Sequence, residues 1–405
     1  MRLNKRVTVT NSELQTFRSC RQLWDFTYRH LLHPKRSARP LAVGSAIHGG
    51  LAGMYRFIYE CQKLGINAST DEVVNAAHRG MNNKLAEHLQ GLYEKMEADP
   101  RGLNIDELVD ESRATEAEVE GTVLRYVEAF ASDMQNYRVL AVEQAFAVPM
   151  LADDGRATPR LMYRGVFDLV LFDPNIGDVI LCEHKSTAGD ARLVESKIDM
   201  DPQTTGYIWT LSRRGFAAKW KGAAPELYEH LDAPVGRVFY NVLRKSGPKQ
   251  PKWTKDGTLS AAACDTTRDV YEAALRIQEE RGGPREDGKP VGPKPRSEKQ
   301  IEVLNAMSND TGKWMKRHEV WHSQEEQQRW RREVVVEGGQ IRRAIAGKLP
   351  VIRNPGHCNM PWSMPCAFRG ICRHDTPAGR ELDFRTVPNP HMEVIESEEE
   401  QGGTF

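Results

Sequence analysis

The chain has 405 residues, of which 40% are hydrophobic, and its 56 basic residues balance its 56 acidic residues to a formal net charge of zero. This length is sufficient for the hydrophobic core of one large domain or of two. The balanced charge excludes nucleic-acid binding driven by net charge alone. No secretory signal and no membrane-length apolar run occurs, and seven cysteines are an odd number for a disulfide framework. We therefore expect a cytoplasmic protein in a reducing compartment, without membrane contact.

Helical patterns occupy the first third of the chain. Between Thr10 and Tyr28, cap-type residues precede apolar residues at helical spacing, which predicts one or two amphipathic helices. After a joint rich in Pro and Arg, Gly44-Ser-Ala-Ile-His48 opens another helix, and helical periodicity continues to about Tyr137. We expect an N-terminal helical segment at 1–40 and a helical region at 41–138.

A β-hairpin follows. The apolar runs Tyr163–Phe172 and Asp178–Ser186 flank the turn-type residues 173–177. If the turn is centred near Asn175 and Ile176, residues whose numbers sum to 351 face each other. This register sets Asp168 opposite Glu183.

Opposed carboxylates repel each other unless something pairs with them, and a divalent cation is the usual partner. Side chains alternate along a strand, so Lys185 shares a face with Glu183 while His184 points the other way. Oxygen ligands of this kind suit Mg²⁺ or Mn²⁺, and a nearby ammonium suits hydrolysis of a phosphodiester. The alternative is a surface hairpin whose charges face water.

The rest of the chain divides by pattern. Strands at Val139–Pro149 and Arg237–Arg244 and a helix at Asp201–Ser212 surround the hairpin, so we expect an α/β core at 139–244. The expected segments beyond it are an insertion with flexible loops at 245–324, a long helix interrupted at Gly338-Gly339 and a cysteine segment within 325–385, and a disordered acidic tail at 386–405.

Three cysteines lie close together near the end of the chain. Cys358, Cys366 and Cys372 occur within fifteen residues of a loop rich in Pro, Gly and aromatic residues, a density typical of metal ligands. A tetrahedral zinc site or a cubane cluster needs a fourth ligand, which His357, His374 or a distant cysteine could provide. Cys20 is our candidate, although a lone helical cysteine is more often a small core residue.

In their order along the chain, these motifs resemble the iron–sulfur members of the RecB-like branch of the PD-(D/E)xK nucleases, which include the AddB nuclease domain and exonucleases of CRISPR systems and phages. Leu14-x-x-Phe-x-x-Cys20 and Gly44-Ser-Ala-Ile-His48 resemble the first cluster cysteine and the histidine motif. The central aspartate, the ExK motif, the Gln-x-x-x-Tyr helix and the terminal cysteine pair have their counterparts at Asp168, Glu183-His-Lys185, Gln203 to Tyr207, and Cys366 and Cys372. The spacing from Cys358 to Cys366 is longer than the family's.

The resemblance implies a restriction-endonuclease-like core, with a mixed central sheet flanked by helices. It implies that His48, Asp168, Glu183 and the backbone carbonyl of His184 bind Mg²⁺ or Mn²⁺, and that Lys185 positions the attacking water. It also implies a 4Fe-4S cluster, with Zn²⁺ as the alternative, on four cysteines that tie the chain ends together. The implied ligands and supporting residues are Cys20, Cys358, Cys366 and Cys372 for the cluster, and Gln203, Tyr207 and Glu143 beside the site. For Gln203 and Tyr207 the implied role is contact with DNA and the alternative is packing, whereas for Glu143 the alternative to a supporting carboxylate is a solvated strand position.

The function so implied is that of a metal-dependent DNA exonuclease acting on single-stranded or frayed ends in recombination, repair or phage DNA processing, in a bacterial or phage-infected cell. The alternatives are a structure-specific endonuclease and a non-catalytic DNA-binding subunit of a recombination complex. A zinc-stabilised interaction module is a third. The sequence has no Gly-x-x-x-x-Gly-Lys-Ser/Thr phosphate loop, so a helicase activity would belong to a partner chain.

Overall fold

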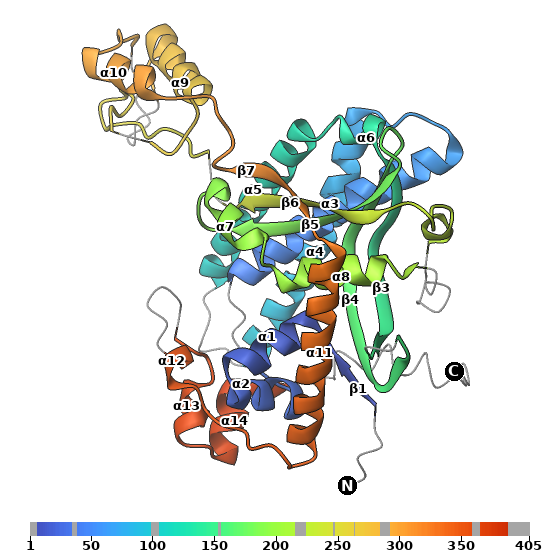
Figure 1. Cartoon of the computed structure of the whole chain (residues 1–405). Helices are drawn as coiled ribbons and strands as arrows, with labels where there is room; N and C mark the ends of the chain where they lie inside the picture. The colour runs from blue at the N-terminus through green and yellow to red at the C-terminus, as the bar shows by residue number, and fades with distance from the viewer. Residues whose placement is uncertain are drawn as a thin grey trace.

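A mixed six-stranded sheet forms the centre of the molecule and is flanked by helices on both faces, which confirms the expected fold class (Figure 1). The computed structural model describes residues 6–34, 39–98, 105–152, 155–214, 224–245, 248–262, 264–283, 292–358 and 365–387. The expected acidic tail lies outside these residues from 388 onward. Within them, no helix combines the length and the apolar character that crossing a membrane requires.

The sheet has the order β1-β4-β5-β6-β7, with β3 paired to β4 along the other edge of β4. β1 and β4 are parallel, as are β5 and β6, and the remaining pairs are antiparallel. The strands are β1 Val7–Val9, β3 Arg138–Leu151, β4 Ala157–Asp173, β5 Asp178–Thr187, β6 Val235–Arg244 and β7 Met315–Trp321.

β4 and β5 form the predicted hairpin in the predicted register. Their Cα partners run from Asp173↔Asp178 to Leu169↔Cys182, all on the sum of 351. The turn closes because the Asp173 carboxylate accepts the Asn175 N–H at 2.9 Å and Gly177 takes a φ of 80°, which glycine adopts without strain.

Beyond the pair Leu169↔Cys182 the two strands separate. β4 continues beside β1 through Leu161 to Tyr163, whereas β5 continues beside β6 to Thr187. Asp168 and Glu183 are the next residues on the two strands, and in the described ladder they are not paired, so the predicted cross-strand pairing of these two residues is wrong. The sheet therefore opens into a fork where the two predicted carboxylates stand.

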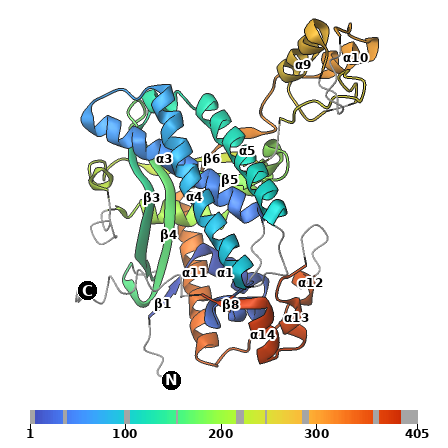
Figure 2. The ribbon, with the colours of Figure 1, turned by 180° about the vertical axis from the view of Figure 1, so that it is seen from behind.

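Two helical layers enclose the sheet (Figures 1 and 2). One apolar core joins a face of the sheet to α3, α4 and α5, and another joins the opposite face to α1, α2, α8 and α11. The helices of these layers are α1 Asn11–Ser19, α2 Arg21–Trp24, α3 Arg39–Leu64, α4 Thr70–Ala98, α5 Ile105–Ala129, α6 Asp133–Asn136, α7 Glu195–Ile198, α8 Pro202–Leu211 and α11 Gln324–Ile345; single turns of other helix types lie at Asp25–Arg29, Ala191–Val194 and Pro225–Tyr228.

The predicted interruption of the long C-terminal helix is wrong, because α11 runs through Gly338-Gly339. A Cβ at Gly338 would lie 2.5 Å from a Leu161 methyl carbon, so the missing side chain lets the helix approach the sheet closely. A Ser323–Glu326 capping box starts this helix.

The segment at 245–324 that we expect to be an insertion contains a strand of the sheet and two helices. Its last part is β7, an edge strand paired with β6, and its middle part holds α9 Arg268–Arg281 and α10 Glu298–Ala306, which stand apart from the sheet in Figure 1. Lys316, Arg317 and Glu319 lie among the buried residues of β7, so the strand has no continuous apolar run by which the sequence could predict it.

The two ends of the described chain lie together (Figure 2). β2 Leu32–Pro34 pairs with β8 Phe384–Thr386, and the Asn354 side chain donates to the Ser19 carbonyl at 2.7 Å. The rings of Phe26 and Phe368 stack with centroids 5.7 Å apart. Three short helices complete this region, namely α12 Pro355–Cys358, α13 Arg369–Arg373 and α14 Pro377–Asp383.

Candidate metal centre

Asp168 lies at the fork with its carboxylate held from two sides. Its Oδ2 accepts the backbone N–H of His184 at 2.8 Å and lies 3.6 Å from Nδ1 of His48, which α3 supplies. Residues from β4, β5 and α3 therefore meet at Oδ2 of Asp168, although α3 lies more than a hundred residues upstream of β4. The sequence predicted all three residues, and the structure brings them together.

Glu143 of β3 is the third member of a group of side chains that could hold a metal ion. Ligand atoms of His48, Glu143 and Asp168 all lie within 4.8 Å of one another. Glu143 has a φ of 49° between the ladder pairs Val142↔Leu169 and Gln144↔Phe167. Such a conformation in a non-glycine residue costs roughly 1–3 kcal/mol and marks functional sites when the surroundings hold it. Sequence alone could not separate this role from that of a solvated strand residue.

Glu183, Lys185 and Gln203 form a second polar group beside the first. Glu183 Oε1 accepts from Lys185 Nζ at 2.5 Å and from the Gln203 amide at 2.7 Å, and the Lys185 ammonium also donates to Gln203 Oε1 at 3.0 Å. The Asp201 side chain caps α8 by accepting the Gln203 N–H, which fixes the start of the helix that presents Gln203. The ExK motif and the Gln-x-x-x-Tyr helix therefore meet, as the resemblance implied.

The charges at the fork favour a bound cation. Burial, with the nearby charge of Asp168, raises the pKa of Glu183 to about 8 and that of Glu143 to about 7. Burial alone would lower the pKa of His48, but its contact with Asp168 outweighs burial and raises it. Among the residues that the structure describes, none gives a hydrogen bond to the buried Oε2 of Glu183. Excess carboxylate, one imidazole and an unpartnered buried oxygen fit a divalent ion such as Mg²⁺ or Mn²⁺.

The side chains of His184 and Tyr207, which belong to the same motifs, pack against aromatic rings. His184 is buried on the face opposite Glu183, between the rings of Tyr55 and Tyr126, and burial lowers its pKa to about 3. Tyr207 is 7% exposed and packs edge-on against the rings of Phe146 and Phe167. The geometry therefore favours packing for Tyr207, while Gln203 faces the candidate site.

The four predicted cluster cysteines gather at the joined chain ends. Burial raises the pKa values of the Cys366 and Cys372 thiols, and the neighbouring thiols of Cys20 and Cys358 raise both further. Across the described part of the chain, these thiols do not form a group of three within 4.8 Å. Residues 359–364, between Cys358 and Cys366, lie outside the described ranges.

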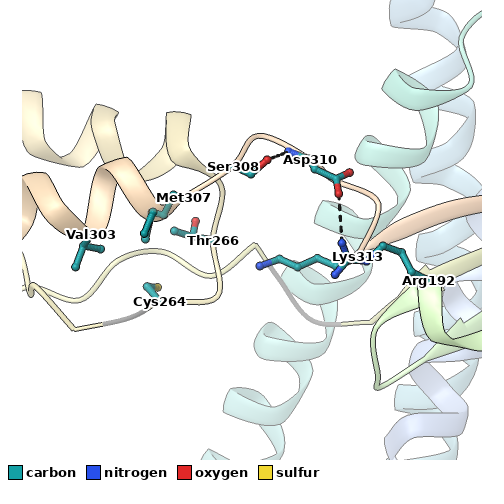
Figure 3. A pocket seen from close by; sticks show the side chains of 9 residues that line it. Arg192, Cys264, Thr266, Val303, Met307, Ser308, Asp310 and Lys313 are labelled. Atoms are coloured by element: carbon teal, nitrogen blue, oxygen red, sulfur yellow. Dashed lines mark hydrogen bonds and ion pairs between the residues drawn. The ribbon is translucent and has the colours of Figure 1, made fainter.

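A cavity of about 390 Å³ lies where the α9–α10 segment joins the sheet (Figure 3). Arg192 and Lys313 line it from the sheet side, and Arg192 pairs there with Asp310. Val303 and Met307 line it from α10 and the residue that follows. None of the predicted site residues lines this cavity, so the candidate centre is the fork.

Comparison with known proteins identifies the family of the chain. The family model described as the PD-(D/E)XK nuclease superfamily matches residues 8–373, a span that contains every residue of the fork and all four clustered cysteines. No curated protein matches the chain. Since the family model covers nearly the whole chain, the protein belongs to the PD-(D/E)XK nuclease superfamily, whose members are metal-dependent nucleases.

Proposed function

We propose that this protein is a metal-dependent DNA exonuclease that hydrolyses phosphodiester bonds from single-stranded or frayed ends, in recombination, repair or phage DNA processing. The observation that carries the proposal is the convergence of His48, Glu143 and Asp168 beside the Glu183–Lys185 pair at the fork. The exonuclease class and a helicase or recombinase partner rest on the resemblance to RecB-like nucleases.

Each residue has a role in this proposal. His48, Asp168 and Glu183, with the His184 backbone carbonyl, hold the Mg²⁺ or Mn²⁺, and Glu143 is either a further ligand or a support for them. The ion would neutralise phosphoryl oxygens and activate water. Lys185, held by Glu183 and Gln203, orients the attacking water and balances the developing negative charge.

We also propose that Cys20, Cys358, Cys366 and Cys372 hold a 4Fe-4S cluster, with Zn²⁺ as the alternative. Support comes from the gathering of the four thiols and from the contacts that join both chain ends around them. A cluster at this place closes a loop of more than 330 residues, which restricts the unfolded chain and stabilises the fold. Visible absorbance of anaerobically purified protein distinguishes the cluster from zinc.

The experiment that tests the activity compares linear and circular DNA. Anaerobically purified protein is incubated with Mn²⁺ and with single-stranded DNA labelled at the 5′ end, labelled at the 3′ end, or closed into a circle. Release of short labelled products from linear DNA, with the circle intact, is the expected result. Cleavage of the circle supports an endonuclease instead. No cleavage of any substrate by folded protein contradicts the stand-alone enzyme and supports a non-catalytic DNA-binding role.

A further inference from the structure

A row of three polar side chains, two of them buried and the third half-buried, crosses the sheet directly behind the fork. His184 of β5 is paired in register with Asn241 of β6, and Asn241 is paired with Arg317 of β7. The His184 and Asn241 side chains are almost fully buried. Side chains at paired positions project to the same face of a sheet, so the three form one line leading away from the ExK strand.

Hydrogen bonds along this row fix how each group is oriented. Arg317 Nε donates to Asn241 Oδ1 at 2.7 Å, which turns the amide nitrogen of Asn241 toward the other strand. That nitrogen lies 3.3 Å from His184 Nδ1 and 3.2 Å from the Tyr126 hydroxyl. Because an amide nitrogen only donates, His184 Nδ1 must accept and the imidazole is held in one tautomer.

The far end of the row is anchored by an ion pair between the half-buried Arg317 and the buried Asp133. Arg317 donates from both terminal nitrogens to the two oxygens of Asp133, at 2.9 and 2.7 Å. Tyr55 donates to the same carboxylate at 3.0 Å, and its oxygen lies 2.8 Å from that of Tyr126. The ring of hydrogen bonds is therefore closed, and its charged groups have partners, as a buried network requires.

His184 links this network to the metal centre. Its backbone N–H binds Asp168, its ring lies edge-on to the His48 ring with centroids 6.1 Å apart, and it separates Glu183 from Lys185 in the chain. A shift of the His184 ring or peptide would displace the acceptor oxygen of Asp168. Groups that orient metal ligands from outside change metal affinity by about 10–100-fold when they are removed.

We infer that Asp133, Asn241 and Arg317 are positioning residues for the metal centre, acting through His184. The inference rests on the proposed function in one respect, namely that the fork binds a divalent ion. A sequence search misses these residues because three separate elements supply them and the chain has no local motif around them.

The test measures metal binding directly. In the double variant Asp133→Leu/Arg317→Met, the charges of the buried Asp133 and the half-buried Arg317 are replaced together by apolar side chains, a change that folded proteins often tolerate. Mn²⁺ affinity is measured by electron paramagnetic resonance titration, and the fold by melting temperature and circular dichroism. We expect a folded protein whose Kd for Mn²⁺ rises at least about tenfold. If the double variant is unfolded, Arg317→Lys retains the cation and loses the bond to Asn241, and it should show the same loss.

A matched control separates positioning from stability. Arg237 of β6 is a buried cation, paired with Asp173 at 3.1 Å and with Glu319 at 2.8 Å, and it lies at the hairpin-turn end of its strand, away from the fork. Arg237→Met should lower the melting temperature and leave the Kd for Mn²⁺ unchanged. Wild-type Mn²⁺ affinity in the folded Arg317 variants would overturn the inference. Absence of Mn²⁺ binding by the wild type would instead refute the proposed metal site, and the positioning inference with it.

Discussion

The contact between α3 and α4 beside His48 leads to a sharp prediction for Gly80→Ala. A Cβ at Gly80 would lie 2.1 Å from the Gly49 carbonyl oxygen and 3.1 Å from the Gly53 Cα, and these backbone atoms cannot rotate away. The helices must separate by about 1 Å, an overpacking that typically costs about 1–3 kcal/mol. Alanine gains about 1 kcal/mol over glycine in a helix, so the net effect is a destabilisation of about 0–2 kcal/mol.

The effect of Gly80→Ala on activity should exceed its effect on stability. Gly49 follows His48 directly, so separating the helices moves the imidazole, and a displacement near 1 Å can cost about a hundredfold in rate. Melting temperature and Mn²⁺-dependent cleavage of single-stranded DNA measure the two effects. Gly339→Ala in α11 is the control, because a Cβ there meets nothing within 4 Å, and it should stabilise the protein slightly. Wild-type activity in a folded Gly80→Ala protein would show that the contact between α3 and α4 does not position His48.

Three further predictions follow from the geometry. Burial raises the pKa of Glu183 from 4.5 to about 8, so between these two pH values the metal-free folded protein holds a proton that the unfolded chain has released. Protonation of Glu183 therefore stabilises the fold fully below pH 4.5, and this contribution is lost as the pH rises through 8. Metal-free Glu183→Gln should therefore melt above the wild type at pH 8 by about 2 °C or more, and no difference between pH 5 and pH 8 would contradict the burial argument. Cys20→Ser and Cys372→Ser should each remove the visible absorbance of the anaerobic protein and lower its melting temperature, whereas Cys264→Ser, away from the chain ends, should retain the colour; colour retained in both ligand variants would exclude the cysteine site. Tyr207→Ala should cost about 3–5 kcal/mol of stability through lost packing, while Tyr207→Phe should leave DNA affinity unchanged; weakened binding by the Phe variant, measured by fluorescence anisotropy, would show that the hydroxyl contacts DNA.

The hairpin and its register could be predicted because local chemistry determines them. Asp173 and Gly177 specify the turn, and a two-residue period then fixes which side chains face each other. The separation of β4 from β5 at Asp168 could not be predicted this way. It depends on β1, a strand from the start of the chain that occupies the edge of β4 beyond the fork.

Long-range placement also explains what the sequence left open. Glu143 reaches the site through a positive φ that the neighbouring sequence does not predict. β7 could not be predicted because charged residues interrupt its buried ones. Gly338 looked like a helix breaker, but its role is close packing against Leu161. In each case the deciding partner is distant in the sequence, where local propensity carries no information.

We expect the fork between β4 and β5 to be a metal-dependent nuclease site. The most direct measurement compares wild type and Lys185→Ala on end-labelled single-stranded DNA with Mn²⁺ and with EDTA, after circular dichroism shows that both are folded. We expect cleavage with Mn²⁺ that EDTA abolishes, and a cleavage rate about a hundredfold or more lower in Lys185→Ala. Equal cleavage by the variant, or cleavage that persists in EDTA, would contradict it.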